Sequence, residues 1–307
     1  MKINPIYIIA LFGVMICILI SCNPGGKGVH EEKTNAENPI AWEDNTPKVM
    51  VAAHRGDWIH APENSLKGFR HCIEAGVDII ETDVQISKDG VPVILHDTTL
   101  NRTTDGDGAV REFNLVQLKR FRLKDATGIL TDERIPTLEE TMLLTKGKTF
   151  VYLDKSKGKI DKILPVLEKT GTLSQSMFVL DYSYDEAQKQ FGDYLDQVIF
   201  VPVISDKTIK PESYVKEYMD KLRPKAFQFR IADETSPVWK LVKMVSSDSR
   251  AFIAATWSHH SAGHDDYVSR KNPELGWGWL MDKGVSIIET NHPDDLQKYI
   301  KGKSLHE

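Results

Sequence analysis

The segment that decides the fold is DIIETDVQISKDGVPVILHD, residues 78–97. It contains two apolar runs, 78–84 and 91–95, separated by a short polar stretch that ends in Asp89-Gly90. Parallel strands need a connection of about a dozen residues or more, whereas Asp-Gly is a strong signal for a tight turn between antiparallel strands. We therefore expect the second run to fold back along the first as a hairpin.

The remaining apolar runs alternate with helical patterns, which is typical of βα units and a parallel sheet. Counting the two above, the runs lie at residues 49–53, 78–84, 91–95, 149–154, 176–181, 197–203, 225–230, 251–257 and 284–289. The hairpin arm is not a barrel strand, so eight of these nine remain. Eight parallel strands in a chain of 307 residues predict an α/β fold, a TIM (β/α)8 barrel with a small β-hairpin and loop insertion at the C-terminal rim after strand 2.

The connecting helices have recognisable ends in the sequence. Capping boxes and a proline in the first turn mark helix starts, and glycine marks helix ends. The first helix is expected over Pro62–Ala75, with Gly76 as its stop. Capping boxes at Thr137–Glu140 and Ser183–Glu186 start two more helices, and the helix that starts at Ser183 is expected to end near Gly192. Two further helices are expected to begin at Pro237 and Pro293.

Residues 1–22 have the proportions of a lipoprotein signal peptide. Lys2 precedes an uncharged apolar run, Ile6 to Ile20, which is shorter than the ~20 residues that span a bilayer. The run leads into Leu-Ile-Ser-Cys, which resembles a bacterial lipobox with Cys22 as the lipidated residue. An uncleaved anchor helix is the alternative. Both predict an exported domain held to the membrane of the bacterial cell envelope, facing the periplasm or the cell surface.

Residues 23–47 are rich in Gly, Pro, Asn and charge, with one isolated Trp42. Such a segment buries too little apolar surface to order itself, so we expect a flexible tether followed by a folded domain over 48–303. The single cysteine of that domain, Cys72, has no partner for an intradomain disulfide, so stability must come from the core. A net charge of −5 gives no general attraction to nucleic acid.

Three carboxylates are placed to hold a metal ion. Glu81 and Asp83 are two apart in a strand, so their side chains point to one face. Asp154, at the end of the next barrel strand, can supply a third oxygen. Converging carboxylates repel unless one protonates or a cation binds, and an all-oxygen set suits one divalent cation, Mg²⁺ or Ca²⁺. The alternative is that these carboxylates cap neighbouring helices or pair with lysines.

Two histidines stand at strand ends beside these carboxylates. His54 follows the run 49–53 and His96 follows the hairpin arm. Histidine moves protons near neutral pH, and Arg55 is a permanently charged donor suited to phosphate oxygens. Two imidazoles, a divalent cation and an arginine are the equipment for phosphoester cleavage, in which one histidine takes a proton from the attacking oxygen and the other protonates the leaving oxygen.

In its motifs the sequence resembles the glycerophosphodiester phosphodiesterases. The resemblance is dense over residues 49–155 and looser to about 300. The matching motifs are AHRG at 53–56, APENS at 61–65, ETDV at 81–84, KDGVPVILHD at 88–97, LNRTTDGDG at 100–108 and IPTLEE at 135–140. The resemblance implies a metal-dependent TIM barrel that hydrolyses glycerophosphodiesters to an alcohol and glycerol 3-phosphate.

The family's functional residues carry over onto matching positions. His54 and His96 correspond to its acid and base pair, in an order that the sequence leaves open. Arg55 corresponds to the phosphate contact, and Glu81 and Asp83 correspond to metal ligands.

The chain departs from the family pattern at two places. Where the family usually has Glu-x-Lys, this chain has Asp154-Lys155-Ser156, so the aspartate replaces a ligand and the lysine is shifted by one residue. Strand alternation turns Lys155, a candidate substrate contact, away from the face of Asp154 unless a bulge re-aims it. Asn291 stands where a Thr-Asp-x-Pro pattern is usual.

Two long connections, 97–136 and 258–283, leave the C-terminal ends of strands and are expected to cover the site. Trp257 ends the strand before the second one and can form an apolar wall against glycerol or another alcohol. That connection also offers possible zinc ligands, His259, His260, His264, Asp265 and Asp266, but Ser261-Ala262-Gly263 disfavours a helix that would align His260 with His264. Head-group recognition or a solvated loop is the preferred interpretation.

Two further functions fit the same residues. A lyase on the same barrel, similar to phosphatidylinositol-type phospholipases, would release a cyclic phosphate. A lipoprotein with a degenerate barrel would bind phosphodiesters or glycans without cleaving them. Loss of either histidine would have favoured the second alternative, and both His54 and His96 are present.

Overall fold

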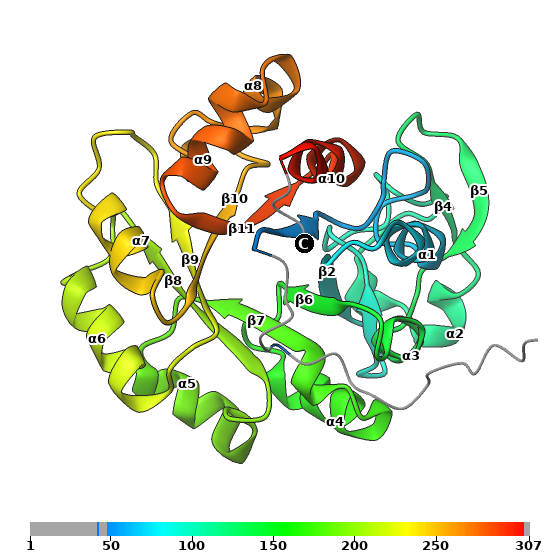
Figure 1. Cartoon of the computed structure of the whole chain (residues 1–307). Coiled ribbons are helices and arrows are strands. Elements are labelled where there is room, and N and C mark those ends of the chain that lie inside the picture. Colours follow the sequence, from blue (N-terminus) through cyan, green and yellow to red (C-terminus); the bar gives the residue numbers. More distant parts are fainter. Residues whose placement is uncertain (1–41, 43–47, 304–307) are drawn as a thin grey trace, which may run out of the picture. The chain divides into compact units, whose positions relative to one another are not determined.

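The computed structural model describes Trp42 and residues 48–303, and eight parallel strands form a closed barrel (Figure 1). The strands are β1 (Met50–Ala53), β2 (Ile79–Ile86), β6 (Phe150–Asp154), β7 (Ser176–Leu180), β8 (Ile199–Ser205), β9 (Ala226–Arg230), β10 (Arg250–Ala254) and β11 (Val285–Thr290). They follow one another around the barrel, which closes where β11 pairs with β1. The predicted TIM barrel is confirmed, with each of the eight expected runs supplying one strand.

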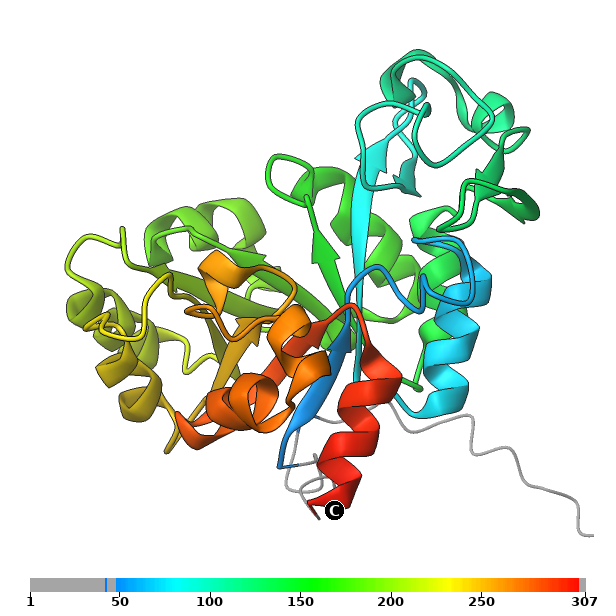
Figure 2. The same ribbon diagram turned by 90° about the horizontal axis from the view of Figure 1, so that it is seen from above.

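The ninth run is the return arm of a hairpin, as predicted. β3 (Pro92–Ile94) pairs antiparallel with the outer half of β2, with Ile86 opposite Pro92 and Val84 opposite Ile94. Gly90 makes the turn with φ 82°. The eight-residue β2 therefore extends beyond the barrel, as the cyan strand in Figure 2 shows. Because the Leu95 amide still donates to the Asp83 carbonyl at 3.0 Å, the arm delivers the next residue, His96, to the barrel rim.

Side-chain alternation along the strands separates two apolar clusters. One fills the barrel and includes Ile79, Phe150 and Tyr152. The other lies between the strands and the helices and includes Ile80 and Val151. Polar residues that share the parity of the first cluster must face the barrel interior. This rule places the last polar residues of β2 and β6 inside the mouth of the barrel.

Helices surround the barrel (Figure 1). They are α1 (Leu66–Ala75), α3 (Leu138–Thr145), α4 (Ile160–Thr170), α5 (Tyr184–Phe191), α6 (Pro211–Lys221), α7 (Trp239–Val245) and α10 (Pro293–Gly302), with short 3-10 turns η2 (Leu173–Gln175) and η3 (Gly192–Tyr194). Both predicted capping boxes are formed, because Thr137 and Ser183 accept from the amides of Glu140 and Glu186. Helix α10 begins at Pro293 as expected, and α7 begins at Trp239, just after Pro237.

The predicted start of the first helix at Pro62 is wrong. Helix α1 begins at Leu66, because the Ser65 hydroxyl caps it by accepting from the Gly68 amide at 3.0 Å. Asn64 adopts φ 57°, which is incompatible with a right-handed helix. Residues 62–64 instead belong to a loop that crosses the barrel mouth, and this matters for the site.

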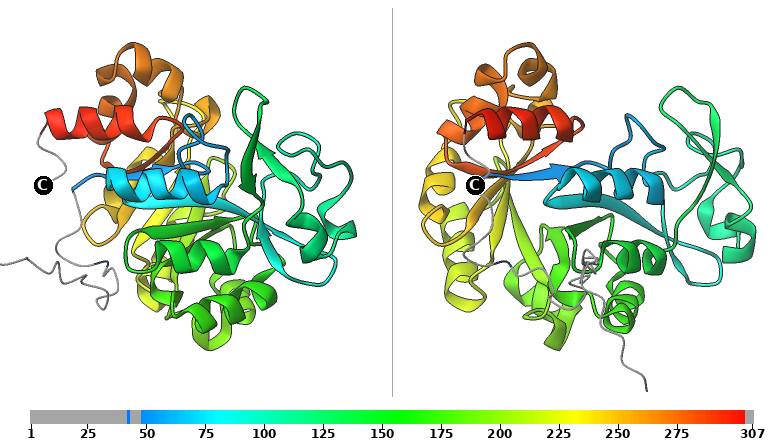
Figure 3. Two further views of the ribbon diagram at one scale, coloured as in Figure 1. Left: turned by 90° about the vertical axis from the view of Figure 1, so that its right-hand side faces the viewer. Right: turned by 45° about the vertical axis from the view of Figure 1, so that its right-hand side comes forward.

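The first long connection, 97–136, is a small ordered insertion beside the barrel rim (Figures 2 and 3). It contains a 3-10 turn η1 (Val110–Glu112), a helix α2 (Leu115–Leu118) and an antiparallel hairpin of β4 (Arg122–Lys124) and β5 (Leu130–Arg134). It has an apolar core of its own, formed by Val93, Leu95, Leu100, Val110, Leu118, Leu123 and Ile135. The residues that follow His96 are therefore held by packing.

The second long connection, 258–283, is also ordered. It consists of η4 (Ser258–His260), α8 (Asp266–Lys271), a π-helical turn η5 (Glu274–Gly278) and α9 (Trp279–Asp282). The His264 ring stacks on Trp279 with centroids 3.6 Å apart, and its Nδ1 lies 2.5 Å from the Leu275 carbonyl oxygen. His259 and His260 lie against each other with ring centroids 4.3 Å apart. Of the five candidate zinc ligands, His264 is thus used for packing within the connection.

Trp42 packs onto the N-terminal end of the barrel. Its ring lies edge-on to Phe150 with centroids 4.9 Å apart, against the cluster that fills the barrel. The predicted signal peptide, Cys22 and the rest of the predicted tether lie outside the described residues. Within the described part, no helix combines the length and apolar character needed to cross a membrane.

Gly56, in the loop after β1, has no room for a side chain. It adopts φ 75°, and an added Cβ would lie 2.8 Å from Cδ1 of the buried Phe69. Left-handed strain of about 1–2 kcal/mol and overpacking of about 1–3 kcal/mol lead us to expect that Gly56→Ala lowers the free energy of unfolding by about 2–5 kcal/mol. Urea denaturation measures this loss.

Gly90 provides the matched control for Gly56. It has φ 82°, but apart from its chain neighbours no atom of residues 48–303 lies within 4 Å of the position that a Cβ would take. Gly90→Ala should therefore cost only the conformational strain, about 1–2 kcal/mol. Equal losses in the two variants would show that contact with Phe69 contributes nothing.

Candidate active site

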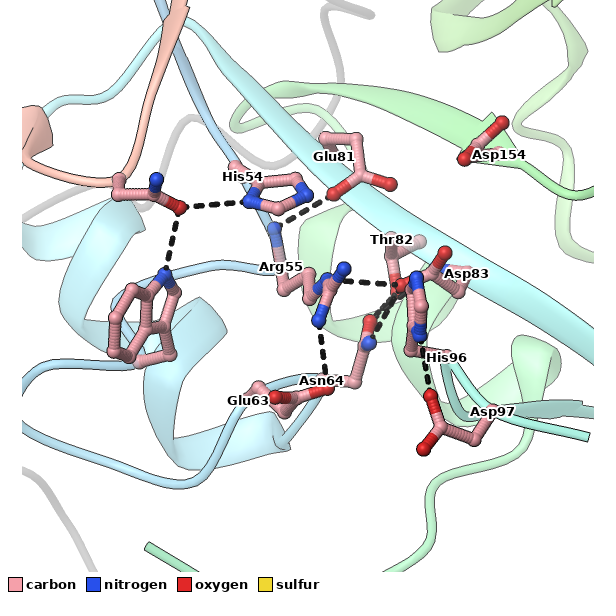
Figure 4. A network of polar contacts seen from close by, with 12 residues as sticks. His54, Arg55, Glu63, Asn64, Glu81, Thr82, Asp83, His96, Asp97 and Asp154 are labelled. Atoms are coloured by element: carbon pink, nitrogen blue, oxygen red, sulfur yellow. Dashed lines mark hydrogen bonds and ion pairs between the residues drawn. The ribbon is translucent and has the colours of Figure 1, made fainter. Parts of the chain in front are cut away.

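Three carboxylates from two neighbouring strands meet inside the barrel mouth. Glu81 and Asp83 lie on β2, and Asp154 lies opposite Asp83 in the register with β6. One oxygen from each lies within 4.8 Å of the others. Figure 4 shows the three carboxylates together with both histidines. The expected convergence of the three side chains is present, as strand parity requires.

The charge of this cluster is poorly compensated by the protein. Glu81 and Asp83 are almost fully buried. Burial raises the pKa of Glu81 well above its usual range, with a further contribution from Asp83, and burial also raises the pKa of Asp83. Arg55 supplies a neighbouring positive charge, with its Nε 3.6 Å from Asp83 Oδ2. Buried oxygens with this excess of negative charge fit a divalent cation, and a purely oxygen donor set suits Mg²⁺ or Ca²⁺.

The loop after β1 orients two of these carboxylates. The backbone amide of Arg55 donates to Glu81 Oε2 at 2.7 Å. The Asn64 side chain donates from Nδ2 to Asp83 Oδ2 at 2.9 Å and accepts from the Thr82 hydroxyl at 2.7 Å. Arg55 and Asn64 both have positive φ, so the loop is held in an uncommon conformation at the site where it touches the cluster.

His54 is held as a neutral imidazole. Its Nδ1 lies 2.7 Å from Asn291 Oδ1, which also accepts from the Trp58 indole N–H at 3.1 Å. Because indole nitrogen only donates, the shared atom is an acceptor and His54 Nδ1 carries the proton, which leaves Nε2 with a lone pair. Burial, together with the charge of Arg55, lowers the pKa of His54 to about 4.

His96 has a carboxylate partner instead. Its Nδ1 lies 2.5 Å from Asp97 Oδ1. Arg102 donates to both oxygens of Asp97, at 2.7 and 3.0 Å, and to both oxygens of Glu63, at 2.7 and 2.8 Å. The hydrogen bond from Arg102 holds the pKa of Asp97 far below its usual range, so an ionised Asp97 faces His96 Nδ1.

One cavity of about 110 Å³ joins these groups. It is lined by His54, Arg55, Glu81, His96, Tyr152, Asp154, Gln228, Arg230, Ala254, Trp257, His260 and Glu289. A larger cavity of about 480 Å³ lies outside it, between the loop after β1 and the insertion. Trp257 lines both cavities and is 47% exposed, with its ring 6.4 Å from that of His54. His54 and Arg55 also line both cavities, so these three residues lie where the inner and outer spaces adjoin.

Arg55 and Lys155 occupy different positions relative to the cavity. Arg55 lines it, but its guanidinium also contacts Glu63 at 3.2 Å and Asp83. Lys155 follows β6 with φ 54° and is not among the residues that line either cavity. Its assignment as a substrate contact remains a prediction from the sequence.

Sequence reasoning missed several residues that build the site. Glu63, Asn64 and Arg102 lie in motifs shared with the family, yet their roles depend on contacts between distant segments. Asp266, on α8, accepts from the Asn291 amide at 2.7 Å and the Thr290 hydroxyl at 2.6 Å, and it thereby fixes the strand end that carries Asn291. The remaining missed residues line the inner cavity and are Gln228, Arg230 and Glu289.

Comparison with known proteins gives a consistent result. The model of the glycerophosphoryl diester phosphodiesterase family matches residues 54–294. A glycerophosphodiester phosphodiesterase of Caldanaerobacter subterraneus is 44% identical over 105 residues, which cover 34% of this chain and 43% of that protein. Human glycerophosphodiester phosphodiesterase 1 is 32% identical over 128 residues, covering 40% and 38%. Each match spans less than half of the relative's own length.

Solved structures share the fold over most of the chain. A glycerophosphoryl diester phosphodiesterase of Parabacteroides distasonis superposes with a TM-score of 0.69 at 24% identity, covering 85% of this chain and 89% of that one. An Oleispira antarctica phosphodiesterase, solved with the product sn-glycerol-3-phosphate, has a TM-score of 0.58 at 22% identity and covers 82% and 96%. At these identities the likeness concerns the fold.

Proposed function

The chain belongs to the glycerophosphoryl diester phosphodiesterase family, and from that membership we propose that it hydrolyses glycerophosphodiesters to an alcohol and glycerol 3-phosphate. The observation that carries the proposal is the pair of histidines with unlike partners in one cavity. His54 is neutral beside an amide, and His96 is paired with an ionised carboxylate. Groups with opposite proton-transfer tendencies on one cavity are what a phosphodiester hydrolase needs.

The partners of the histidines assign the two proton transfers. His54, with Nε2 free of a proton, takes a proton from the attacking water as its oxygen bonds to phosphorus. His96, whose Nδ1 is held by the carboxylate of Asp97, gives a proton to the ester oxygen as the phosphorus–oxygen bond to the alcohol breaks. Asn291 and Asp97 act by fixing which ring nitrogen faces the cavity in each case.

Glu81, Asp83 and Asp154 would hold one divalent cation, Mg²⁺ or Ca²⁺. Such a cation neutralises charge on the phosphate oxygens as negative charge develops. Arg55 lines the same cavity and adds a fixed positive charge beside the carboxylates. Asn64 and the Arg55 amide keep the oxygens of Asp83 and Glu81 turned toward one point.

A product assay tests the proposal. The enzyme is incubated with glycerophosphocholine, glycerophosphoethanolamine, glycerophosphoglycerol and glycerophosphoinositol, first with EDTA and then with Mg²⁺ or Ca²⁺ added, and phosphorus NMR follows the products. We expect glycerol 3-phosphate and the free alcohol with an added cation. A cyclic phosphate that persists would identify a lyase. Cleavage of no substrate under any condition would identify a binding protein.

We also propose that the protein is exported and anchored to the bacterial cell envelope by lipid on Cys22. The support is the sequence of residues 1–22, a charged start, a short apolar run and a lipobox-like end. Mass spectrometry of the mature protein tests this, because a lipid-modified N-terminal Cys22 is expected. An intact Met1 without lipid would contradict it.

A further inference from the structure

Arg230 is the last residue of β9 and stands at the barrel mouth. It shares the parity of Ala226, which belongs to the cluster inside the barrel, so its side chain rises from the barrel interior. Its Nε donates to Gln228 Oε1 at 3.0 Å. Both residues line the same cavity as the two histidines and the carboxylates Glu81 and Asp154. A guanidinium therefore faces the reaction space from the side opposite to β2.

The positive charge of Arg230 is not taken up by an ion pair among residues 48–303. No carboxylate of this part of the chain lies within 4.0 Å of its guanidinium. Within the same residues, its side chain donates a hydrogen bond to the neutral side chain of Gln228. Arg55 differs, since its guanidinium contacts both Glu63 and Asp83. The guanidinium of Arg230 thus enters the cavity without an ion pair to residues 48–303, which leaves its terminal nitrogens available to an anion.

Because of the position of Lys155, the charge of Arg230 can take over a contact to the substrate phosphate. The family resemblance places a lysine beside the ligand of the third barrel strand, but Lys155 follows that strand with φ 54° and does not line the catalytic cavity. A phosphodiester needs positive charge on the side away from the metal ligands as well, because negative charge on its oxygens grows in the transition state.

We propose that Arg230 binds the phosphate group of the substrate, donating from its terminal nitrogens to a non-bridging oxygen on the side opposite Glu81 and Asp154. This inference rests on the proposed function, since it specifies a further contact of the same phosphate. Arg230 holds this position through Gln228, whose side chain is almost fully buried beneath it. A planar guanidinium is well suited to phosphate oxygens, and lysine substitutes for it poorly.

A purely structural role for Arg230 is the competing explanation. Glu289 is a buried carboxylate on β11 that lines the same cavity; burial raises its pKa to about 8, and the charge of Arg230 opposes that rise. If Arg230 serves only to offset Glu289, neutralising both residues together would restore whatever neutralising Arg230 alone destroys.

The experiment measures binding of glycerol 3-phosphate and of inorganic phosphate by calorimetry, in the full-length protein with the divalent cation present. A lost charge-assisted hydrogen bond leads us to expect affinity roughly 10- to 100-fold lower in Arg230→Gln, with partial retention in Arg230→Lys. The rise in KM should be similar across the glycerophosphodiester panel, because the phosphate is common to all. Lys155→Gln should have the smaller effect.

The controls are Arg223→Gln and the pair with Glu289. Arg223 is exposed just before β9, at the opposite end of the same strand, so its variant should bind as the unmodified protein does. Affinity should stay low in Arg230→Gln/Glu289→Gln. Restored affinity in this double variant, unchanged affinity in Arg230→Gln, or no binding of either probe by the unmodified protein would each overturn the inference. Binding without hydrolysis would instead refute the proposed function and leave the Arg230 comparison decisive.

Discussion

His54→Ala is expected to lower kcat by roughly 10²- to 10⁴-fold on glycerophosphocholine, and His96→Ala by a comparable factor. The reason is that, in the proposed mechanism, each imidazole transfers one of the two protons on which hydrolysis depends. The two variants should differ on an aryl phosphodiester, whose leaving oxygen departs without protonation. On that substrate His96→Ala should recover most of its activity, while His54→Ala, which lacks the base, should remain slow. Steady-state kinetics on both substrates measure the contrast.

His60 is the matched control for the histidine variants. It lies six residues beyond His54, its side chain is 60% exposed, and it pairs with Asp57 outside both cavities. His60→Ala should retain normal kcat on both substrates. Recovery of His54→Ala rather than His96→Ala on the aryl substrate would reverse the acid and base assignment. Equal recovery would show that neither histidine acts as the acid.

Removal of the divalent cation is expected to abolish activity, and Glu81→Gln is expected to reproduce that loss. EDTA should inactivate the unmodified enzyme, with recovery on adding Mg²⁺ or Ca²⁺. Loss of a bound cation removes several kcal/mol of transition-state stabilisation, so Glu81→Gln should lower kcat/KM by roughly 10³-fold with the cation present. Kinetic assays across a cation titration measure both effects.

Thermal unfolding gives a second measure that does not depend on turnover. Without a cation, Glu81 is buried beside Asp83 and its charged form is disfavoured. Neutralising it should raise the Tm of the cation-free protein by roughly 2–4 °C for each kcal/mol of repulsion relieved. Added cation should stabilise the unmodified protein but barely affect Glu81→Gln.

Asp220→Asn, an exposed change on α6, should leave both the activity and the cation-induced rise in Tm intact. An equal cation-induced rise in Tm for Glu81→Gln and the unmodified protein would show that the ion binds elsewhere.

The barrel could be predicted from the sequence because its signals are local. Apolar runs, capping boxes and the Asp89-Gly90 turn each depend on a few neighbouring residues. Together they predict eight parallel strands, which is the number in the barrel. The convergence of Glu81, Asp83 and Asp154 followed from strand parity alone. Loop conformation was harder: the error at Pro62 arose because a helical pattern continues through residues that a left-handed Asn64 takes out of the helix.

The contacts that tune the site could not be predicted, because they join segments that are far apart in the chain. Arg102 reaches Glu63 across 39 residues, and Asn291 reaches His54 across 237. Arg230 gave no signal in the sequence, since an arginine at a strand end is ordinarily a solvated residue whose stem packs on the surface. Its position in the cavity becomes evident only when the strands close into a barrel.

The origin of His96 on a hairpin arm has a consequence for how such an enzyme can be remodelled by evolution. His54 is attached to the framework of the barrel itself, whereas His96 leads directly into a module with its own core, joined to the barrel loop by the Glu63–Arg102 bridge. In the proposed mechanism, exchanging that module would change the partners of the histidine that protonates the leaving alcohol, Asp97 and Arg102, while sparing the histidine that activates water. Specificity for a different leaving alcohol can therefore be sought by replacing this one module. The replacement must keep the Glu63–Arg102 ion pair that joins the module to the barrel loop.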